Sequence, residues 1–185
     1  MIDILERPAV RSQVTPISVE SYHVLRDLGL VDVKTELING VILEKMTKSP
    51  RHTLILNRLY QAPARDCPPG YLLRKEDPLT LAASEPEPDL AIVAGDIEAY
   101  ADAHPTTAEL VVEVAVSSLD LDRAKAAGYA GAGIPTYWLV IPGERAVEVY
   151  AQPGRSGYGM VSRVEEDGRV DTWYDTTIEL STVFA

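Results

Sequence analysis

The chain has 185 residues, of which 46% are hydrophobic and 24% are charged, and this composition predicts a globular protein whose residues 1–185 form one domain. Its net charge of −11 at pH 7 argues against a general nucleic-acid coat protein, which would carry a basic excess, but it is compatible with an enzyme that has a local basic patch. The sequence shows no long apolar run, no secretory signal and only one cysteine, so we expect a cytoplasmic protein without membrane spans or disulfides.

The first half of the chain is predicted to form two helices and a hairpin. Ser18 is a suitable N-cap for the first helix, and Gly29 is suited to its C-terminal end. Asn39-Gly40 between two apolar runs is the strongest short signal for a β-hairpin, and Pro50 is favoured at the first position of a helix. The expected elements are a flexible arm over residues 1–15, a helix over 19–28, a hairpin over 36–43, and a helix from residue 50 to the turn at 68–70.

The second half of the chain is dominated by apolar, β-branched segments that indicate strands. The expected elements are strands over 71–75, 79–81, 90–93, 110–116 and 136–141, a short helix over 96–102, a helix over 120–131, and antiparallel strands over 147–150 and 160–164. Tyr137 and Trp138 lie in an apolar strand and are expected in the core. This order predicts an α/β protein with a mixed β-sheet flanked by helices, carrying additional antiparallel strands near the C-terminus.

One carboxylate lies inside the most apolar run of the chain. Glu113 follows three apolar residues and precedes three more, so it is expected at the centre of a strand buried on both faces. An ionised glutamate there is costly unless a positive charge meets it. The partner could be an arginine or a lysine, or a divalent cation that Glu113 shares with a second acid.

Asp89 is the candidate for that second acid. It follows Pro88 and begins the preceding major strand, so two adjacent strands would bring Asp89 and Glu113 to the same end of the sheet. Their oxygens would suit Mg²⁺ or Mn²⁺. Lys125, on the helix after the Glu113 strand, could reach the same place, although a lysine on a helix more often faces water. Asp89 could instead cap a turn.

The sequence contains a single cluster of basic residues. Lys48, Arg51 and His52 are candidate nucleic-acid contacts, but a solvated basic face and a structural histidine are the commoner explanations for such residues. The cluster consists of Lys45, Lys48, Arg51 and Arg58. Ser117-Ser118 is interpreted as the start of a helix and not as a nucleophile, because the sequence shows no histidine–acid pair for it.

Several segments between about residues 19 and 150 together resemble the Uma2 family of endonucleases. They are ELING at 36–40, SPRH at 49–52, EPEPD at 85–89, VVEV at 111–114, DRAK at 122–125 with Tyr129-Ala130, and GIPTYW at 133–138. The family is assigned to the PD-(D/E)xK nuclease superfamily, so the resemblance implies a restriction-endonuclease-like core. Fold alone does not settle activity.

The resemblance also implies roles for individual residues. Asp89 would be the aspartate of the PD element and Glu113 the acid of the (D/E)xK element, both as metal ligands, with the Val114 carbonyl as a further ligand. The sequence departs from the plain pattern at Ala115, where the motif has lysine, and Lys125 would take over that function by holding the attacking water or the phosphate. Glu36 resembles an upstream acid of the superfamily that acts through water or on a second ion.

Together these observations predict a Mg²⁺-dependent or Mn²⁺-dependent endonuclease that hydrolyses phosphodiester bonds in DNA through Asp89, Glu113 and Lys125. One alternative is a catalytically silent nuclease fold that binds DNA or a protein partner, and another is the same chemistry on RNA or a small phosphate ester. By analogy with related nucleases, the strands after residue 146 suggest contacts in a homodimer.

Overall fold

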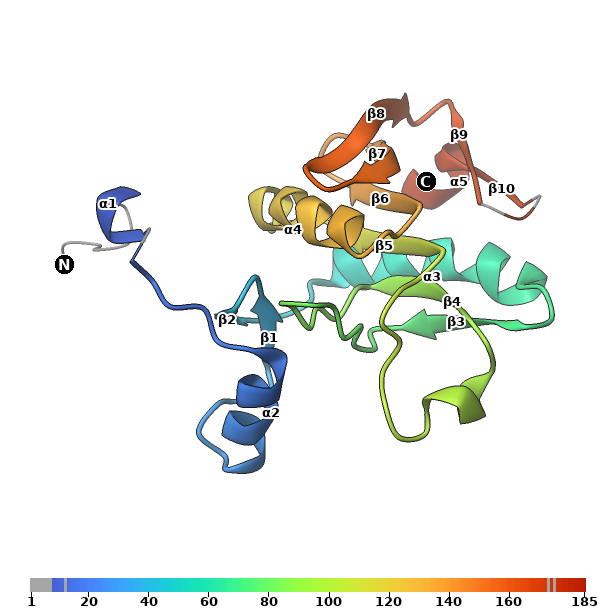
Figure 1. Ribbon diagram of the computed structural model, residues 1–185. Helices are drawn as coiled ribbons and strands as arrows, with labels where there is room; N and C mark the ends of the chain where they lie inside the picture. The colour runs from blue at the N-terminus through green and yellow to red at the C-terminus, as the bar shows by residue number, and fades with distance from the viewer. Residues whose placement is uncertain (1–7, 12, 173, 175) are drawn as a thin grey trace.

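A six-stranded sheet in the order β3-β4-β5-β6-β7-β8 forms the centre of the computed structural model, which describes residues 8–11, 13–172, 174 and 176–185 (Figure 1). Neighbouring strands are antiparallel except for β5 and β6, which are parallel and are connected by α4. The strands are β3 Tyr71–Lys75, β4 Leu90–Ala94, β5 Leu110–Val114, β6 Thr136–Ile141, β7 Ala146–Gly154 and β8 Gly157–Glu165. The predicted mixed sheet is therefore confirmed.

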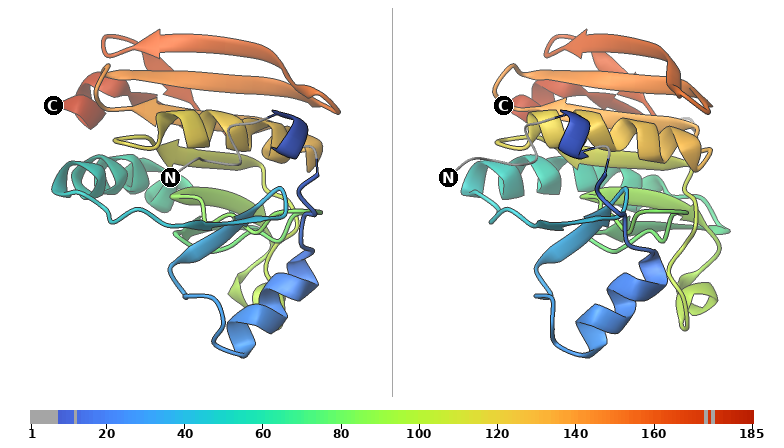
Figure 2. Two further views of the ribbon diagram at one scale, coloured as in Figure 1. Left: turned by 90° about the vertical axis from the view of Figure 1, so that its left-hand side faces the viewer. Right: turned by 60° about the vertical axis from the view of Figure 1, so that its left-hand side comes forward.

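Helices cover both faces of the sheet, and strand alternation decides which side chains meet them. On one face, Leu90, Val112 and Trp138 pack in a cluster with α3 (Pro50–Asp66) and α5 (Leu180–Phe184). On the other face, Ala91, Val111 and Tyr137 pack with α4 (Leu119–Gly131). In Figure 2 the strands of the sheet run above, between and below the long helices α3 (teal) and α4 (yellow). Glu113 lies two residues after Val111 on β5, so its side chain points to the same face of the sheet, toward α4.

The N-terminal elements form a smaller group beside the main sheet. They are α1 (Pro8–Arg11), α2 (Val19–Asp27) and the hairpin of β1 (Thr35–Ile38) and β2 (Val41–Glu44), which form a two-stranded sheet of their own. Asn39 and Gly40 have φ angles of 50° and 75°, as the predicted Asn-Gly turn requires. Residues 1–7 and 12 of the expected flexible arm lie outside the described residues, and Figure 1 shows α1 standing away from the sheet.

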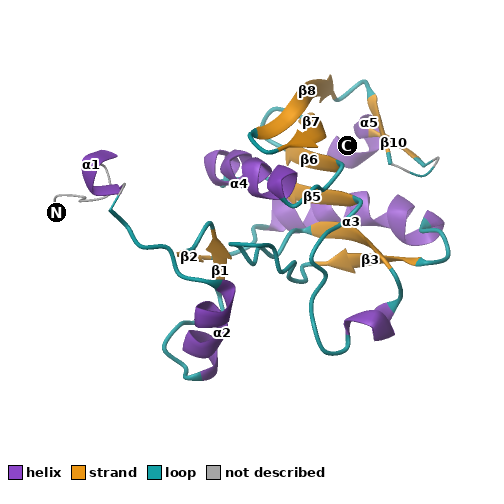
Figure 3. Cartoon of the chain, viewed as in Figure 1, coloured by secondary structure: helices purple, strands orange, loops and turns teal. Residues whose placement is uncertain are grey.

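One predicted strand is wrong. Residues 79–81 lie in the long connection between β3 and β4, drawn as a loop in Figure 3. Leu79 donates its N–H to the Pro86 carbonyl and Leu81 donates to the Ser84 carbonyl, so the segment folds back on itself instead of joining a sheet. The two leucines are nevertheless 0% and 6% exposed, so the apolar signal reflected burial and not strand pairing.

The remaining predicted helices and strands are confirmed with small changes of boundary. The short helix over 96–102 is the 3₁₀ turn Ile97–Tyr100, and Trp138 and Tyr137 are buried core residues. The chain also contains β9 (Arg169–Asp171), β10 (Thr177–Glu179) and α5, which the sequence analysis did not predict. Among the described residues, no helix has both the length and the apolar character needed to cross a membrane.

Candidate active site

A polar cleft of about 570 Å³ opens at the start of β4 and the end of β5, where these strands meet the β1–β2 hairpin, the start of α3 and the start of α4. This size is within the usual range for ligand sites. Carboxylates outnumber cationic side chains around it: the charged residues lining the cleft are Glu36, Glu44, Glu76, Glu87, Asp89, Glu113, Asp122, Lys34, Lys45, Lys48 and Lys125. The cleft therefore has the charge to attract a cation and would repel a polyanion on its own.

Asp89 is fixed at the start of β4 by contacts that engage one of its two oxygens. The antiparallel register pairs Leu90 with Val112, so the beginning of β4 lies beside the end of β5. Its Oδ2 accepts the Val114 N–H at 2.8 Å and lies 3.0 Å from His52 Nε2. Asp89 Oδ1 has only a longer ion pair with Lys48, at 3.6 Å, among the described residues.

Glu113 is likewise held through only one of its two carboxylate oxygens. Its Oε1 accepts hydrogen bonds from the Tyr129 hydroxyl at 2.9 Å and from Lys125 Nζ at 3.1 Å, both on α4. In the part of the chain that the structure describes, Oε2 has no hydrogen bond. Burial raises the pKa of Glu113 to about 8, and repulsion by Asp122 and Asp89 adds to this while Lys125 offsets part of it.

Lys125 is the shared cation of three buried carboxylates. Its Nζ lies 3.0 Å from Glu36 Oε1, 3.1 Å from Glu113 Oε1 and 3.5 Å from Asp122 Oδ1, and the side chain is only 6% exposed. Burial alone would lower the pKa of Lys125, but the attraction of Glu113, Glu36 and Asp122 raises it above the ordinary value, so the ammonium stays charged. One ammonium therefore faces three carboxyl groups, and their mutual repulsion contributes to the raised pKa values of Glu113 and Asp122.

Glu36 and Asp122, two of the carboxylates around Lys125, come from different elements. Glu36 comes from β1 and also accepts the Glu87 N–H at 3.4 Å through Oε2. Asp122, on the first turn of α4, was missed by the sequence analysis, because acids in a first helical turn usually complement the helix dipole in solvent. Here Ser118 donates its hydroxyl to Asp122, and burial raises the pKa of Asp122. Tyr129 entered the sequence analysis only as part of the family resemblance and was given no function there.

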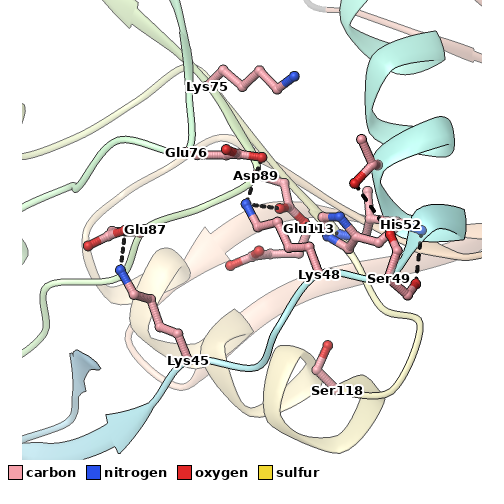
Figure 4. A network of polar contacts seen from close by, with 12 residues as sticks. Lys45, Lys48, Ser49, His52, Lys75, Glu76, Glu87, Asp89, Glu113 and Ser118 are labelled. Atoms are coloured by element: carbon pink, nitrogen blue, oxygen red, sulfur yellow. Dashed lines mark hydrogen bonds and ion pairs between the residues drawn. The ribbon is translucent and has the colours of Figure 1, made fainter. Parts of the chain in front are cut away.

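The predicted nucleic-acid contacts separate in space. Lys48 and His52 line the cleft, and Figure 4 shows Lys48 reaching Asp89 and Glu76 while His52 lies on the other side of Asp89. Arg51 lies outside the residues lining the cleft and donates to the Pro142 carbonyl, and Arg58 donates to the Val183 carbonyl at 3.1 Å. Of the basic sequence cluster, only Lys45 and Lys48 face the cleft.

The oxygen donors of the cleft decide whether it can hold a divalent metal ion. The described residues contain no group of three or more His, Cys, Asp or Glu side chains that could hold a metal ion. They do contain two neighbouring carboxylates, Asp89 and Glu113, each anchored through one oxygen with the other not tightly engaged, in a cleft with an excess of acids. Val114 lies between them in the cleft wall, with a carbonyl that accepts the Val116 N–H at 3.2 Å. Hard oxygen ligands of this kind fit Mg²⁺ or Mn²⁺.

Known proteins resemble this chain in sequence and in structure. The sequence model of the family Uma2, described as "Putative restriction endonuclease", matches residues 19–173. A crystal structure from Anabaena variabilis ATCC 29413, described as a "putative nuclease", is similar with a TM-score of 0.73 at 18% identity, covering 91% of this chain and 98% of that chain. Among curated proteins, none matches the sequence. The structural similarity confirms the predicted nuclease-like fold.

Proposed function

The chain belongs to the Uma2 family, since the family match covers residues 19–173, and from this premise we propose that it is a metal-dependent endonuclease that hydrolyses phosphodiester bonds in DNA. The nuclease description belongs to the family and to the similar structure from Anabaena variabilis. For this chain, the observation that supports the proposal most is the pairing of Asp89 and Glu113, each with one oxygen anchored and the other turned to an acidic cleft.

The proposed metal ligands are the less engaged oxygens of Asp89 and Glu113 together with the Val114 carbonyl. A Mg²⁺ or Mn²⁺ ion held there supplies activation of water at neutral pH and compensation of the charge that develops on the phosphoryl oxygens. His52 holds Asp89 in place from α3, and the Val114 N–H ties the same carboxylate to β5. From α4, the Tyr129 hydroxyl donates a hydrogen bond to Glu113 and so holds this second ligand in place. Such support fixes ligand orientation before an ion binds.

Lys125 is proposed to act as a permanent positive charge and not as a base. Its three carboxylate partners keep the ammonium protonated, so it can hold the attacking water or a phosphoryl oxygen but cannot accept a proton. Glu36 shares this lysine and is proposed to act through a water molecule or on a second ion. In this arrangement the lysine reaches the site from α4, although the position after Val114 on the strand is occupied by Ala115.

The proposal is tested by measuring Mn²⁺ binding calorimetrically at one pH and ionic strength. The variants are D89N and E113Q, which remove the ligand charge with little change of shape, and E44Q, which removes an equal charge from an exposed acid of the same cleft. We expect wild type and E44Q to bind the ion and both ligand variants to lose it, with the fold of each checked by circular dichroism.

Cleavage is then assayed with Mn²⁺ on single-stranded DNA, duplex DNA and RNA oligonucleotides. Turnover of DNA that disappears in D89N and E113Q supports the proposed activity, and preferential turnover of RNA would transfer the same chemistry to a different substrate. If wild type binds no ion either alone or with DNA present, the metal mechanism is refuted. Retention of nucleic acid without turnover would then favour the silent nuclease fold.

A further inference from the structure

Lys48 occupies the part of the cleft that faces the open oxygen of Asp89. Its Nζ lies 3.6 Å from Asp89 Oδ1 and 2.6 Å from Glu76 Oε1, and Figure 4 shows the ammonium between these two carboxylates. Asp89 Oδ2 is engaged by Val114 and His52, so Oδ1 is the oxygen left for a metal ion. An ammonium and a divalent ion at the same oxygen compete for it.

The two cations of the cleft differ in how firmly they are held. Lys125 is buried among three acids, whereas the side chains of Lys48 and Glu76 are 41% and 39% exposed. An exposed ion pair is screened by water and contributes little to stability, so Lys48 can leave Asp89 at small cost. Lys125 cannot leave in this way, because its departure would strand several buried negative charges.

Glu76 is placed for this contact by an unusual backbone conformation. Its φ angle is +61°, in the left-handed region that non-glycine residues seldom adopt. The residue directly follows β3, and its N–H donates to the Asp89 carbonyl at 3.2 Å, so the turn keeps Glu76 beside Asp89, the residue that immediately precedes β4. Strain of this kind persists where the surroundings impose it, and it is common at functional sites.

From this arrangement we propose that Lys48 is a placeholder cation at Asp89: it neutralises the carboxylate in the metal-free protein, and an incoming divalent ion displaces it. Glu76 keeps the displaced ammonium at the mouth of the cleft, where it is available to a phosphate. Binding of the ion therefore also releases Lys48, which can then bind substrate. The inference rests on the proposed function, since it requires that Asp89 bind a metal ion.

The test measures the affinity for Mn²⁺ calorimetrically in wild type, K48Q, K48R and K45Q at one pH and ionic strength. Lys45 is the matched control, because it belongs to the same segment and also pairs with an acid of the cleft, Glu87, at 2.5 Å, which is not a proposed ligand. Removing the competing ammonium is expected to tighten Mn²⁺ binding in K48Q by about fivefold, the scale set by the strength of an exposed ion pair. K48R keeps the charge and should bind like wild type, and K45Q should stay within about twofold of it.

The outcomes separate the two proposals. If K48Q and K45Q change the affinity by the same factor, or if K48Q binds Mn²⁺ more weakly than wild type, the placeholder function is refuted while the metal site stands. If wild type binds no Mn²⁺ at all, the proposed function fails and the inference fails with it. Circular dichroism shows whether the variants remain folded, and because Lys48 is exposed we expect no loss of structure.

Discussion

At the scale of single residues, Lys125 combines a structural and a proposed catalytic function. Among the described residues it is the one cation paired with Glu36, Glu113 and Asp122, and all four side chains are buried. Replacing it with methionine, which has a similar length, leaves three acids without this partner. We expect K125M to lose about 3–5 kcal/mol of unfolding free energy in urea denaturation at pH 7. Lys34→Met, at the rim of the same cleft, is the control, and a similar small loss in both variants would contradict this account.

Glu76 offers a test of backbone strain that is independent of its charge. Both E76A and E76G remove the carboxylate, but only glycine adopts a φ angle of +61° without cost. E76G is therefore expected to be more stable than E76A by about 1 kcal/mol in chemical denaturation. Equal stabilities would mean that the turn relaxes to another conformation once the side chain is removed.

At the scale of elements, the turn of the β1–β2 hairpin is pressed against the chain that precedes α2. A Cβ atom on Gly40 would overlap Pro16 Cβ and lie 2.9 Å from Pro16 Cα, and the φ angle of Gly40 is +75°. Gly29 has a φ angle of +67°, but a Cβ atom there would meet no described atom within 4 Å, so G29A reports the backbone strain alone. We expect G40A to lower the melting temperature more than G29A does, the difference corresponding to about 1–3 kcal/mol of overpacking. Equal shifts would show that Pro16 moves away freely.

A second contact between elements gives a dependence on pH. Arg123 of α4 donates to Glu148 of β7, which also accepts the Tyr150 hydroxyl at 2.7 Å, and the hydrogen bond from Arg123 lowers the pKa of Glu148. A carboxyl with a lowered pKa in the folded state stabilises it above the pKa of the unfolded state, and this contribution disappears as the pH falls through the folded value. E148Q should therefore cost up to about 1 kcal/mol at pH 7 and less near pH 3, measured by thermal denaturation. A constant cost across this range would exclude a charge-based contribution.

The elements also show why sequence reasoning found part of the site and missed the rest. Glu113 was identifiable because it interrupts a fully apolar strand, and Asp89 because Pro88 marks the start of the neighbouring strand. Asp122 and Glu76 carry no such contrast, since Asp122 lies in the first turn of a helix, where acids are common, and Glu76 follows a strand that ends in Arg74 and Lys75. Their contributions depend on how α4 and β3 are placed in space. The roles assigned to Asp89, Glu113, Lys125 and Glu36 stay predictions until metal binding is measured.

At the scale of the whole molecule, charge determines the conditions for binding DNA. The chain carries 28 acidic and 17 basic residues, and the cleft has the same imbalance. DNA should therefore be retained poorly in EDTA and better with Mn²⁺ at equal ionic strength, as measured by electrophoretic mobility shift with D89N as the control. Strong retention of DNA that is the same with and without Mn²⁺ would support the silent nuclease fold instead. The proposed homodimer stays a prediction that sedimentation of the metal-free protein can check.

The separate β1–β2 hairpin has a consequence for the dynamics of the molecule. Glu36 lies on β1, in a hairpin that is not paired with the main sheet. The hairpin is attached to the β3–β4 connection by hydrogen bonds, among them Glu85 N–H to the Leu37 carbonyl at 2.7 Å and Gly40 N–H to the Ala83 carbonyl at 2.9 Å, and to α4 by the ion pair of Glu36 with Lys125. A unit attached in this way can open without global unfolding. Amide hydrogens of the hairpin should therefore exchange with solvent faster than those of β5, and exchange rates would follow the assembly of the cleft while the sheet stays intact.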